Sequence, residues 1–309
     1  MTALDAVSVY APAFRVPIED LADPLGLTDI QVRLFRRFHG LDRIRFDPDR
    51  SAADLLRSAI DGLTELRGNE HRVRYVVHGR AMPVVVPYPH NPLHDVCRDV
   101  GLGHALAFTV THQSCASALL AIDLTGRLLA GDPADDALAL VLTGEKAFTR
   151  DARLLPGTSI FGEGASACLV SADGPRDRLL SYVCAQRGEF DTEFGENEER
   201  FQREYRPSLA GVIHRAVADA GLALDDIDLV LPHNVNVVTW QRLCHLLEFP
   251  VGRVLLSNVP ADGHLFCTDA FANYRTAREG GLLREGDRYL VATVGAGAGA
   301  AFSAMVFQH

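Results

Sequence analysis

Hydrophobic positions along the chain fall into short unbroken runs that alternate with segments of helical periodicity. Short apolar runs bounded by turn residues are typical of strands buried on both faces, and apolar residues three or four apart are typical of helices that cover a sheet. The alternation therefore predicts an α/β protein with helices on both faces of its sheets. The predicted strands span residues 3–10, 75–78, 105–110, 136–143, 165–171, 179–186, 229–231, 253–256, 287–294 and 301–307.

The clearest helical segments span residues 51–67, 116–130, 208–221, 239–248 and 269–279. Ser51 suits the N-cap of the first, with Asp54 three residues on, and Pro207 suits the first turn of the third. The pattern breaks at residues 173–177 and then restarts, which predicts two similar halves, residues 1–172 and 173–309. The charged stretch 187–206 predicts either a mobile cap or a solvated helix.

Composition narrows the classes of function. The 309 residues carry a net charge of −10 with scattered acidic residues, which argues against a nucleic-acid or anionic-membrane partner. No apolar run approaches the ~20 residues that span a bilayer, and the start of the chain lacks a signal-peptide pattern, so we expect a cytoplasmic protein. The six cysteines show neither a CxxC pair nor metal-ligand spacing, so we expect reduced thiols and no metal.

Cys115 stands between the apolar run 105–110 and the helical run 116–130. A thiol at a helix N-terminus is close to unpaired backbone N–H groups and the positive end of the macrodipole, both of which favour the thiolate. Cys115 is therefore a candidate nucleophile. The alternative is an inert core cysteine, because free cysteines are among the most buried residue types.

A thiol nucleophile needs a base or proton shuttle, and two histidines are candidates. His233 follows the apolar run 229–231, at the carboxyl end of a predicted strand, where α/β folds place site residues. His264 lies between the predicted strand 253–256 and the helix that begins near Asp269. For each, the alternative is a structural histidine paired with backbone.

The glycine-rich turn 294–300 lies between the last two predicted strands. Its alternating glycines let the backbone approach a substrate closely, where amides stabilise an oxyanion. The turn lacks the Lys-Ser/Thr of a phosphate loop and leads into a strand, so it does not indicate a nucleotide site. A close-packed hairpin is the alternative.

Taken in chain order, these features resemble the ketoacyl-ACP synthase III group of the thiolase superfamily. Further segments carry the resemblance. Residues 40–45 look like the family's Gly-Ile-x-x-Arg segment, 142–150 like the strand and turn after the nucleophile helix, and 161–166 like Phe-Gly-(Asp/Glu)-Gly-Ala. Residues 233–236 look like His-x-x-Asn, and 295–297 fall on the C-terminal glycine cluster.

The resemblance implies a duplicated five-layer αβαβα thiolase-like fold, a homodimer and acyl transfer through a Cys115 thioester. It implies no cofactor, since the acyl-CoA or acyl-carrier-protein thioester is the substrate. It also implies an oxyanion hole made by the amides of Cys115 and Gly297. The predicted substrate contacts are Asn236, Phe161 and Phe266.

One departure concerns the third catalytic residue, which in ordinary members is an Asn after Gly; here His264 follows Gly263. A Gly-His segment with Asp five residues later resembles the divergent branch that primes polyketides or acylates small-molecule hydroxyls and amines in specialised metabolism. In a Cys115–His264–Asp269 triad, Asp269 would fix the tautomer of His264, which would deprotonate the thiol or an acceptor. Alternatively, Asp269 is only a helix N-cap.

The second departure concerns the donor. The family's tryptophan before residue 40 is absent, and Val237 and Val238 stand where an arginine usually follows His-x-x-Asn. The donor is therefore either free coenzyme A or a carrier protein. Four arginines are candidates to bind a phosphopantetheine phosphate or an acidic helix of the carrier: Arg33, Arg36, Arg37 and Arg43. The alternative is that they only form a solvated basic face.

Three functions follow from these observations. The first is acyl transfer from Cys115 to a small-molecule acceptor. The second is decarboxylative Claisen condensation, in which His233 and His264 both donate to the carbonyl of a malonyl unit. The third is a non-catalytic partner subunit of a ketosynthase heterodimer, which the retained Cys115 and His233 argue against.

Overall fold

The computed structural model describes residues 2–87, 89–191, 197–296 and 299–309. Its strands are β1 (Ala3–Tyr10), β2 (Arg15–Pro17), β3 (Arg43–Arg45), β4 (Val73–Gly79), β5 (Leu106–Val110), β6 (Leu138–Glu145), β7 (Leu154–Leu155), β8 (Ser159–Ile160), β9 (Gly164–Ser171), β10 (Arg178–Arg187), β11 (Leu229–Pro232), β12 (Arg288–Ala296) and β13 (Ala300–Gln308). Its helices are α1 (Ala22–Leu25), α2 (Asp29–Arg33), α3 (Ala52–Asp61), α4 (Pro92–Asp99), α5 (Ser117–Ala130), α6 (Arg150–Arg153), α7 (Glu198–Asp219), α8 (Val237–Leu247), α9 (Asn258–Asp262) and α10 (Asp269–Glu279).

Nine strands are connected in the order β11-β12-β13-β10-β1-β9-β6-β4-β5. The join between β10 and β1 is a single pair, Ala3 with Arg178, whereas β1 pairs with β9 and β10 with β13 over most of their lengths. The connected strands therefore divide into two sheets, one from residues 3–171 and one from residues 178–308. The two sheets meet in the chain at the boundary that the sequence predicted near residue 172. The division of the chain into two domains at this boundary stays a prediction.

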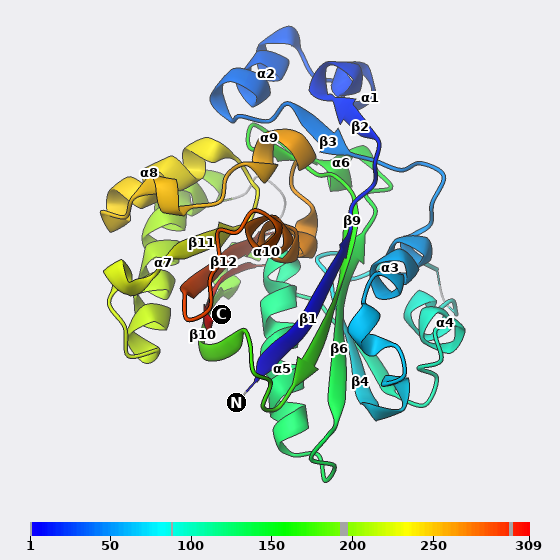
Figure 1. Cartoon of the computed structure of the whole chain (residues 1–309). Coiled ribbons are helices and arrows are strands. Elements are labelled where there is room, and N and C mark those ends of the chain that lie inside the picture. The colour runs from blue at the N-terminus through cyan, green and yellow to red at the C-terminus, as the bar shows by residue number, and fades with distance from the viewer. Residues whose placement is uncertain (1, 88, 192–196, 297–298) are drawn as a thin grey trace.

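Helices α5 and α10 lie between the two sheets. Leu119 and Ile122 of α5 and Phe271 of α10 share one buried cluster with Val141 of β6 and Val291 of β12. Helices α3 and α4 cover the outer face of the first sheet, and α7 and α8 cover the outer face of the second. The order of layers is αβαβα (Figure 1).

Most sequence-predicted elements are confirmed within a few residues, and α10 coincides with its predicted range. The N-cap of α3 is also confirmed. Ser51 Oγ accepts the amide of Asp54 at 3.2 Å, and the Asp54 carboxylate accepts the amide of Ser51 at 2.9 Å. No helix among the described residues is long and apolar enough to cross a membrane.

Three predicted elements were wrong. Residues 253–256 form no strand, because a 3-10 turn over Val251–Arg253 leaves only an isolated bridge from Val254 to Val230. The helix predicted over 51–67 ends at Asp61, and Gly62 is its C-cap. Gly62 packs against Ser8, and a Cβ at this position would come within 2.4 Å of the Ser8 hydroxyl.

The third error concerns α7, which begins at Glu198 and carries Pro207 inside it rather than in its first turn. Phe201 and Tyr205 continue the apolar spacing of the helix toward its N-terminus and pack against Phe302 of β13. The free energy gained from this packing outweighs the free-energy cost of a proline inside the helix. The many charged side chains of this segment made its apolar helical periodicity difficult to recognise in the sequence.

Candidate active site

Cys115 lies where the connection after β5 enters α5. The chain passes through His112 and Ser114 with positive φ angles of 65° and 47°, and a 3-10 turn over Ser114–Ala116 then leads into Ser117. Left-handed backbone at residues other than glycine is unfavourable and is retained where the surroundings require it. The strained connection places the Cys115 side chain, 5% exposed, at the N-terminal end of a 14-residue helix.

His264 connects Cys115 to Asp269. Its Nε2 lies 3.5 Å from Cys115 Sγ, and its Nδ1 lies 2.5 Å from Asp269 Oδ2. All three side chains are buried. The structure therefore brings together the three residues whose spacing suggested a triad, in the order thiol, imidazole, carboxylate.

Burial alone would lower the pKa of His264. The Asp269 carboxylate and the Cys115 thiolate outweigh that effect and raise the pKa to about 10. A ring with such a pKa is an imidazolium at neutral pH, and this cation lies against the sulfur. A cation in this position can stabilise negative charge that develops on the sulfur.

Asp269 is not the N-cap of α10, because Thr268 occupies that position without a side-chain cap and Asp269 is the first helical residue. Its carboxylate instead accepts two backbone N–H groups, from Asn234 at 2.6 Å and from Leu265 at 2.6 Å. These bonds fix the carboxylate against His264 and tie the loops of both candidate histidines to one group.

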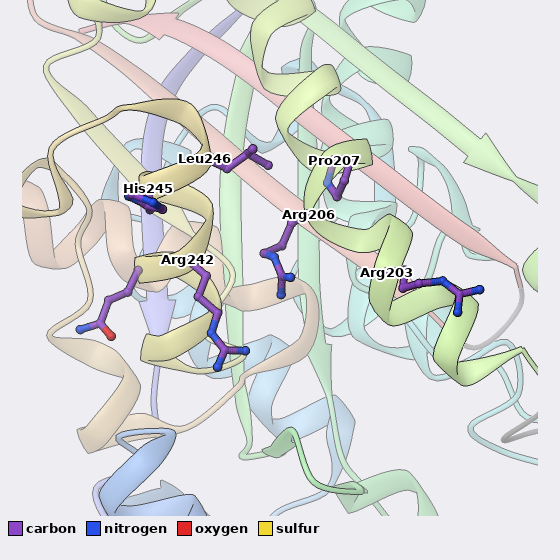
Figure 2. Close-up of a pocket in the computed structure, with 7 residues that line it drawn as sticks. Arg203, Arg206, Pro207, Arg242, His245 and Leu246 are labelled. Atoms are coloured by element: carbon purple, nitrogen blue, oxygen red, sulfur yellow. The ribbon is translucent and has the colours of Figure 1, made fainter.

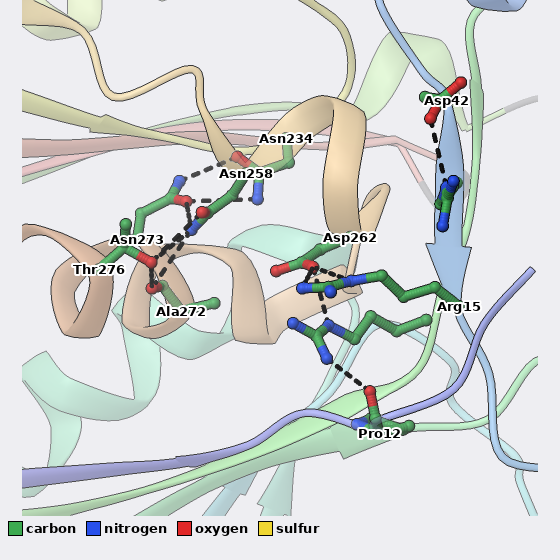
Figure 3. A network of polar contacts seen from close by, with 11 residues as sticks. Pro12, Arg15, Asp42, Asn234, Asn258, Asp262, Ala272, Asn273 and Thr276 are labelled. Carbon is green, nitrogen blue, oxygen red and sulfur yellow. Dashed lines mark hydrogen bonds and ion pairs between the residues drawn. The ribbon is translucent and has the colours of Figure 1, made fainter.

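The turn before His264 is held by a glycine and an ion pair. Gly263 has φ 71°, and a Cβ there would come within 2.8 Å of Ile44 Cγ2. The preceding Asp262 carboxylate lies 2.8 Å from Arg45 Nε and 3.3 Å from Arg15 Nη2, and Arg45 also donates to the carbonyl of Pro12 (Figure 3). Arg45, from the early family-like segment, therefore positions the turn that presents His264.

His233 lies in the same cavity, with its ring centroid 6.1 Å from that of His264. Its Nε2 is 2.7 Å from the hydroxyl of Tyr205, and its Nδ1 is buried without a hydrogen-bond partner among the described residues. Burial, with the nearby His264 cation, lowers the pKa of His233 to about 3, so the ring is neutral. Its carbonyl accepts the indole N–H of Trp240 at 2.9 Å.

A buried amide network supports the loop after His233. Asn273 donates to the Asn234 side chain at 2.9 Å and to the carbonyl of Pro232 at 2.7 Å, and Asn258 donates to Asn273 at 2.8 Å (Figure 3). Fully paired buried polar groups of this kind restrict side-chain and backbone alternatives. The network holds His233 and α10 in a fixed relation.

The cavity has a volume of about 440 Å³ and is bordered by Cys115, His233, His264, Tyr205 and Phe161. The Phe161 ring stacks on Phe266 with centroids 4.2 Å apart and lies 4.5 Å from the His264 ring. Phe161 thus lines the cavity, and its role as a substrate contact stays a prediction. Phe266 is not among the lining residues, and its role as a substrate contact stays a prediction.

Asn236 does not border the cavity. Its Oδ1 caps α8 by accepting the amide of Thr239 at 2.8 Å, and its Nδ2 donates to the carbonyl of Thr158 at 3.1 Å. The side chain therefore joins α8 to the β7–β8 hairpin. The predicted substrate contact of Asn236 stays a prediction.

The glycine-rich turn approaches the nucleophile loop. A Cβ on Gly295 would lie 1.8 Å from the carbonyl oxygen of Gln113, so only glycine allows β12 to pass there. Gly297, the predicted second oxyanion donor, lies outside the described residues. The oxyanion hole stays a prediction.

The sequence did not reveal two polar residues, Tyr205 in the cavity and Glu145, which lies outside the cavity lining and interacts electrostatically with His264. Tyr205 lies in the charged stretch whose helical period was obscured. Glu145, at the end of β6, accepts the amides of Ala81 and Met82 at 2.8 Å each, and burial raises its pKa to about 7. Its position at the carboxyl end of a buried strand was the available signal.

A basic groove lies on the surface between α7 and α8, with a volume of about 560 Å³ (Figure 2). It contains Arg203, Arg206, Arg242 and His245, and the structure gives these arginines no ion pair among the described residues. Arg206 borders the groove and the active-site cavity. The groove therefore reaches the mouth of the site.

The arginines proposed earlier as a basic face lie elsewhere and are partly neutralised. Arg36 contacts Glu19 and Asp42, and Arg43 contacts Asp42. Such exposed pairs contribute little stability.

Residues 217–309 match the family described as 3-oxoacyl-[acyl-carrier-protein (ACP)] synthase III C terminal. The chain is 26% identical over 223 residues to the β-ketoacyl-[acyl-carrier-protein] synthase III of Nitratidesulfovibrio vulgaris, covering 64% of this chain and 66% of the relative. It is 28% identical over 220 residues to that of Rhizorhabdus wittichii, covering 64% and 66%.

Solved structures match nearly the whole chain. The acyltransferase ChlB3 superposes with a TM-score of 0.86 at 19% identity, covering 99% of this chain and 97% of that one. The synthase III of Thermus thermophilus superposes with a TM-score of 0.83 at 20% identity, covering 99% of each chain. The chain is similar to ketoacyl-ACP synthase III proteins and has their thiolase-like fold. The predicted thiolase-like α/β fold is confirmed.

The extent of the matches differs between sequence and structure. In sequence, the synthase III-like chain aligns with just under two thirds of the length of the first two curated relatives. At identities of 19% and 20%, the structural matches describe the fold alone.

Proposed function

We propose that this synthase III-like protein is an acyltransferase. It takes an acyl group from a CoA or carrier-protein thioester onto Cys115 and transfers it to a hydroxyl or amine of a small molecule, as part of specialised metabolism. The observation that carries the proposal is the Cys115–His264–Asp269 arrangement, with contacts of 3.5 and 2.5 Å.

The first step uses the thiolate–imidazolium pair. Cys115 Sγ attacks the donor carbonyl, the bond from that carbon to the donor sulfur breaks, and the His264 proton moves to the leaving thiolate. Acylation removes the negative charge of Cys115, which is one of the influences that raise the pKa of His264. The ring is then neutral and its Nε2 is available as a base.

The second step uses that base on the acceptor. His264 takes the acceptor proton while the acceptor heteroatom bonds to the acyl carbon, and the bond to Cys115 Sγ breaks. The proton stays on His264, which restores the thiolate–imidazolium pair. Asp269, held by two amides, keeps the ring oriented and stabilises its cation in both steps. General acid–base catalysis of this kind contributes about 10²–10⁴ to a rate.

The basic groove supports a phosphate-bearing donor. Arg203, Arg206 and Arg242 would bind the phosphate of a phosphopantetheine arm or the acidic surface of its carrier, because Arg206 also borders the cavity that contains Cys115. Guanidinium groups suit phosphate recognition.

A homodimer is part of the proposal. Strand β5 is the edge of the first sheet, paired only with β4 among the described strands, and its Leu106 is 59% exposed. An open edge with an apolar side chain favours pairing with another strand. Strand β5 of a second copy of the chain would pair with this open edge.

Decarboxylative condensation is the competing reaction, and it needs both imidazoles to donate to one malonyl carbonyl. His233 Nε2 instead contacts the Tyr205 hydroxyl at 2.7 Å, which favours transfer without decarboxylation. Product analysis after incubation with malonyl and simple acyl thioesters separates the reactions. We expect ester or amide with all carbons retained; release of carbon dioxide with a new carbon–carbon bond would establish the ketosynthase.

The partner-subunit function is tested by intact mass. We expect an acyl adduct on Cys115 after incubation with acyl-CoA and acyl-carrier donors of several chain lengths. No adduct with any donor would favour a non-catalytic subunit.

A further inference from the structure

Tyr205 contributes a hydroxyl to the site that neither the sequence motifs nor the triad account for. It projects from α7, borders the cavity together with Cys115 and His264, and lies 2.7 Å from His233 Nε2. Its ring is held edge-on by Phe201 and Phe302, with centroid distances of 5.6 and 6.0 Å. The hydroxyl is therefore fixed in position.

The hydrogen-bonding state of His233 determines which way the Tyr205 proton points. A neutral imidazole carries one N–H, and Nδ1 has no partner among the described residues. Buried N–H donors without partners are rarer than buried acceptors without partners, so the proton belongs on Nε2. His233 then donates to the Tyr205 oxygen.

A tyrosine that accepts from His233 keeps its own O–H free to donate. No other partner of the Tyr205 hydroxyl occurs among the described residues, and the side chain faces the cavity. Burial, with the nearby Cys115 charge, raises the pKa of Tyr205, so the group is a donor and not a phenolate base.

We propose, on the basis of the acyltransferase function above, that Tyr205 is an acceptor-binding residue and that the acceptor is a hydroxyl compound. Its O–H donates to one lone pair of the acceptor oxygen, while the acceptor O–H donates to His264 Nε2. A hydroxyl oxygen has a second lone pair for attack on the acyl carbon. A neutral amine has only one, and a hydrogen bond from Tyr205 would occupy it.

The step balances without another reactant. The acceptor oxygen bonds to the acyl carbon, the carbon–sulfur bond to Cys115 breaks, and the hydroxyl proton is kept by His264. The products are an ester and the deacylated enzyme, with its thiolate–imidazolium pair restored. Water, as the smallest hydroxyl acceptor, gives the carboxylic acid by the same route.

The test compares deacylation of preformed acetyl-Cys115 enzyme by water and by methoxyamine, an amine without a hydroxyl group. Tyr205→Phe removes the donor and keeps the ring. We expect it to slow deacylation by water about tenfold or more and to change deacylation by methoxyamine less than about twofold. Tyr75→Phe, which removes a hydroxyl bonded to Asp132, is the matched control and should change neither rate.

An unchanged water rate, or equal losses with both nucleophiles, would overturn the Tyr205 assignment and leave the acyltransferase function standing. A wild-type protein that forms no acyl-Cys115 would overturn the acyltransferase function itself. If Tyr205→Phe does not fold, His233→Gln and His233→Leu replace it. Gln keeps an N–H toward the Tyr205 oxygen, and Leu does not. We therefore expect water to deacylate the His233→Gln enzyme faster than the His233→Leu enzyme. Equal rates in the two variants would contradict the assignment.

Discussion

His264 Nε2 lies 3.5 Å from Cys115 Sγ across 149 residues of sequence. The thiol comes from the start of α5 in the first half of the chain, and the imidazole comes from the turn before α10 in the second. Because α5 and α10 pack together between the two sheets, folding of both halves is needed to assemble the pair.

Replacing the sulfur tests the nucleophile. We expect Cys115→Ala to form no acyl adduct by intact mass, with a change in the free energy of unfolding of about 1 kcal/mol, because His264 retains Asp269 as its partner. Cys244→Ala, another buried free cysteine on α8, is the matched control and should acylate normally. An adduct that persists on another residue of Cys115→Ala would reject the assignment.

Neutralising Asp269 tests the orientation of the base. We expect Asp269→Asn to slow acceptor transfer about 100-fold, because the imidazolium loses its carboxylate while the shape of the side chain is kept. The exposed Asp173→Asn serves as a control and should transfer at the wild-type rate. Single-turnover transfer from acyl-enzyme measures both, and an unchanged rate in Asp269→Asn would exclude Asp269 from the triad.

Asp269→Asn should also change how the free energy of unfolding depends on pH. The pKa of His264 rises from 6.5 to about 10 on folding, so its protonation contributes stability that is complete below pH 6.5 and is lost as pH rises through about 10. Asp269→Asn removes the first of the influences that raise this pKa. Denaturant unfolding should show the difference between wild type and Asp269→Asn shrinking from pH 6.5 to pH 10; a constant difference would contradict the ionised pair.

The three residues of the proposed triad could be predicted from the sequence because each stands at a recognisable boundary between elements. Cys115 follows an apolar run and opens a helix, and His264 and Asp269 flank the start of another. What the spacing left open was whether Asp269 faced the histidine or capped its own helix. Only the tertiary contacts, with amides of Asn234 and Leu265 on its carboxylate, distinguish the two.

Other parts of the site depend on contacts between distant elements that no local pattern encodes. Tyr205 meets His233 through packing of α7 over the second sheet, in a stretch whose charge hid its helical period. The basic groove needs Arg206 from α7 beside Arg242 from α8. The motif also did not reveal that Asn236 Oδ1 caps α8, and its predicted substrate contact stays a prediction.

Charge reversal in the groove tests donor binding. We expect Arg206→Glu to raise the KM for a carrier-bound acyl donor about tenfold with little change in kcat, because the phosphate or acidic carrier would face a repulsive charge. Arg215→Glu, on the same helix and outside the groove, is the matched control. Steady-state kinetics at low and moderate salt should show the difference shrinking as salt rises; equal KM values at low salt would place donor binding elsewhere.

A charge on the open sheet edge tests the dimer. Leu106 is 59% exposed on β5, whose only recorded partner among the described strands is β4. If a second β5 pairs there, Leu106→Asp places two carboxylates in an apolar contact, and desolvation with like-charge repulsion should raise the dimer dissociation constant at least tenfold, an effect of roughly 1.4 kcal/mol or more. Sedimentation velocity over a range of concentrations measures it, with Leu282→Asp, an exposed leucine outside the sheet, as control. A wild-type protein that sediments as a monomer, or a dimer unaffected by Leu106→Asp, would exclude β5 as the interface.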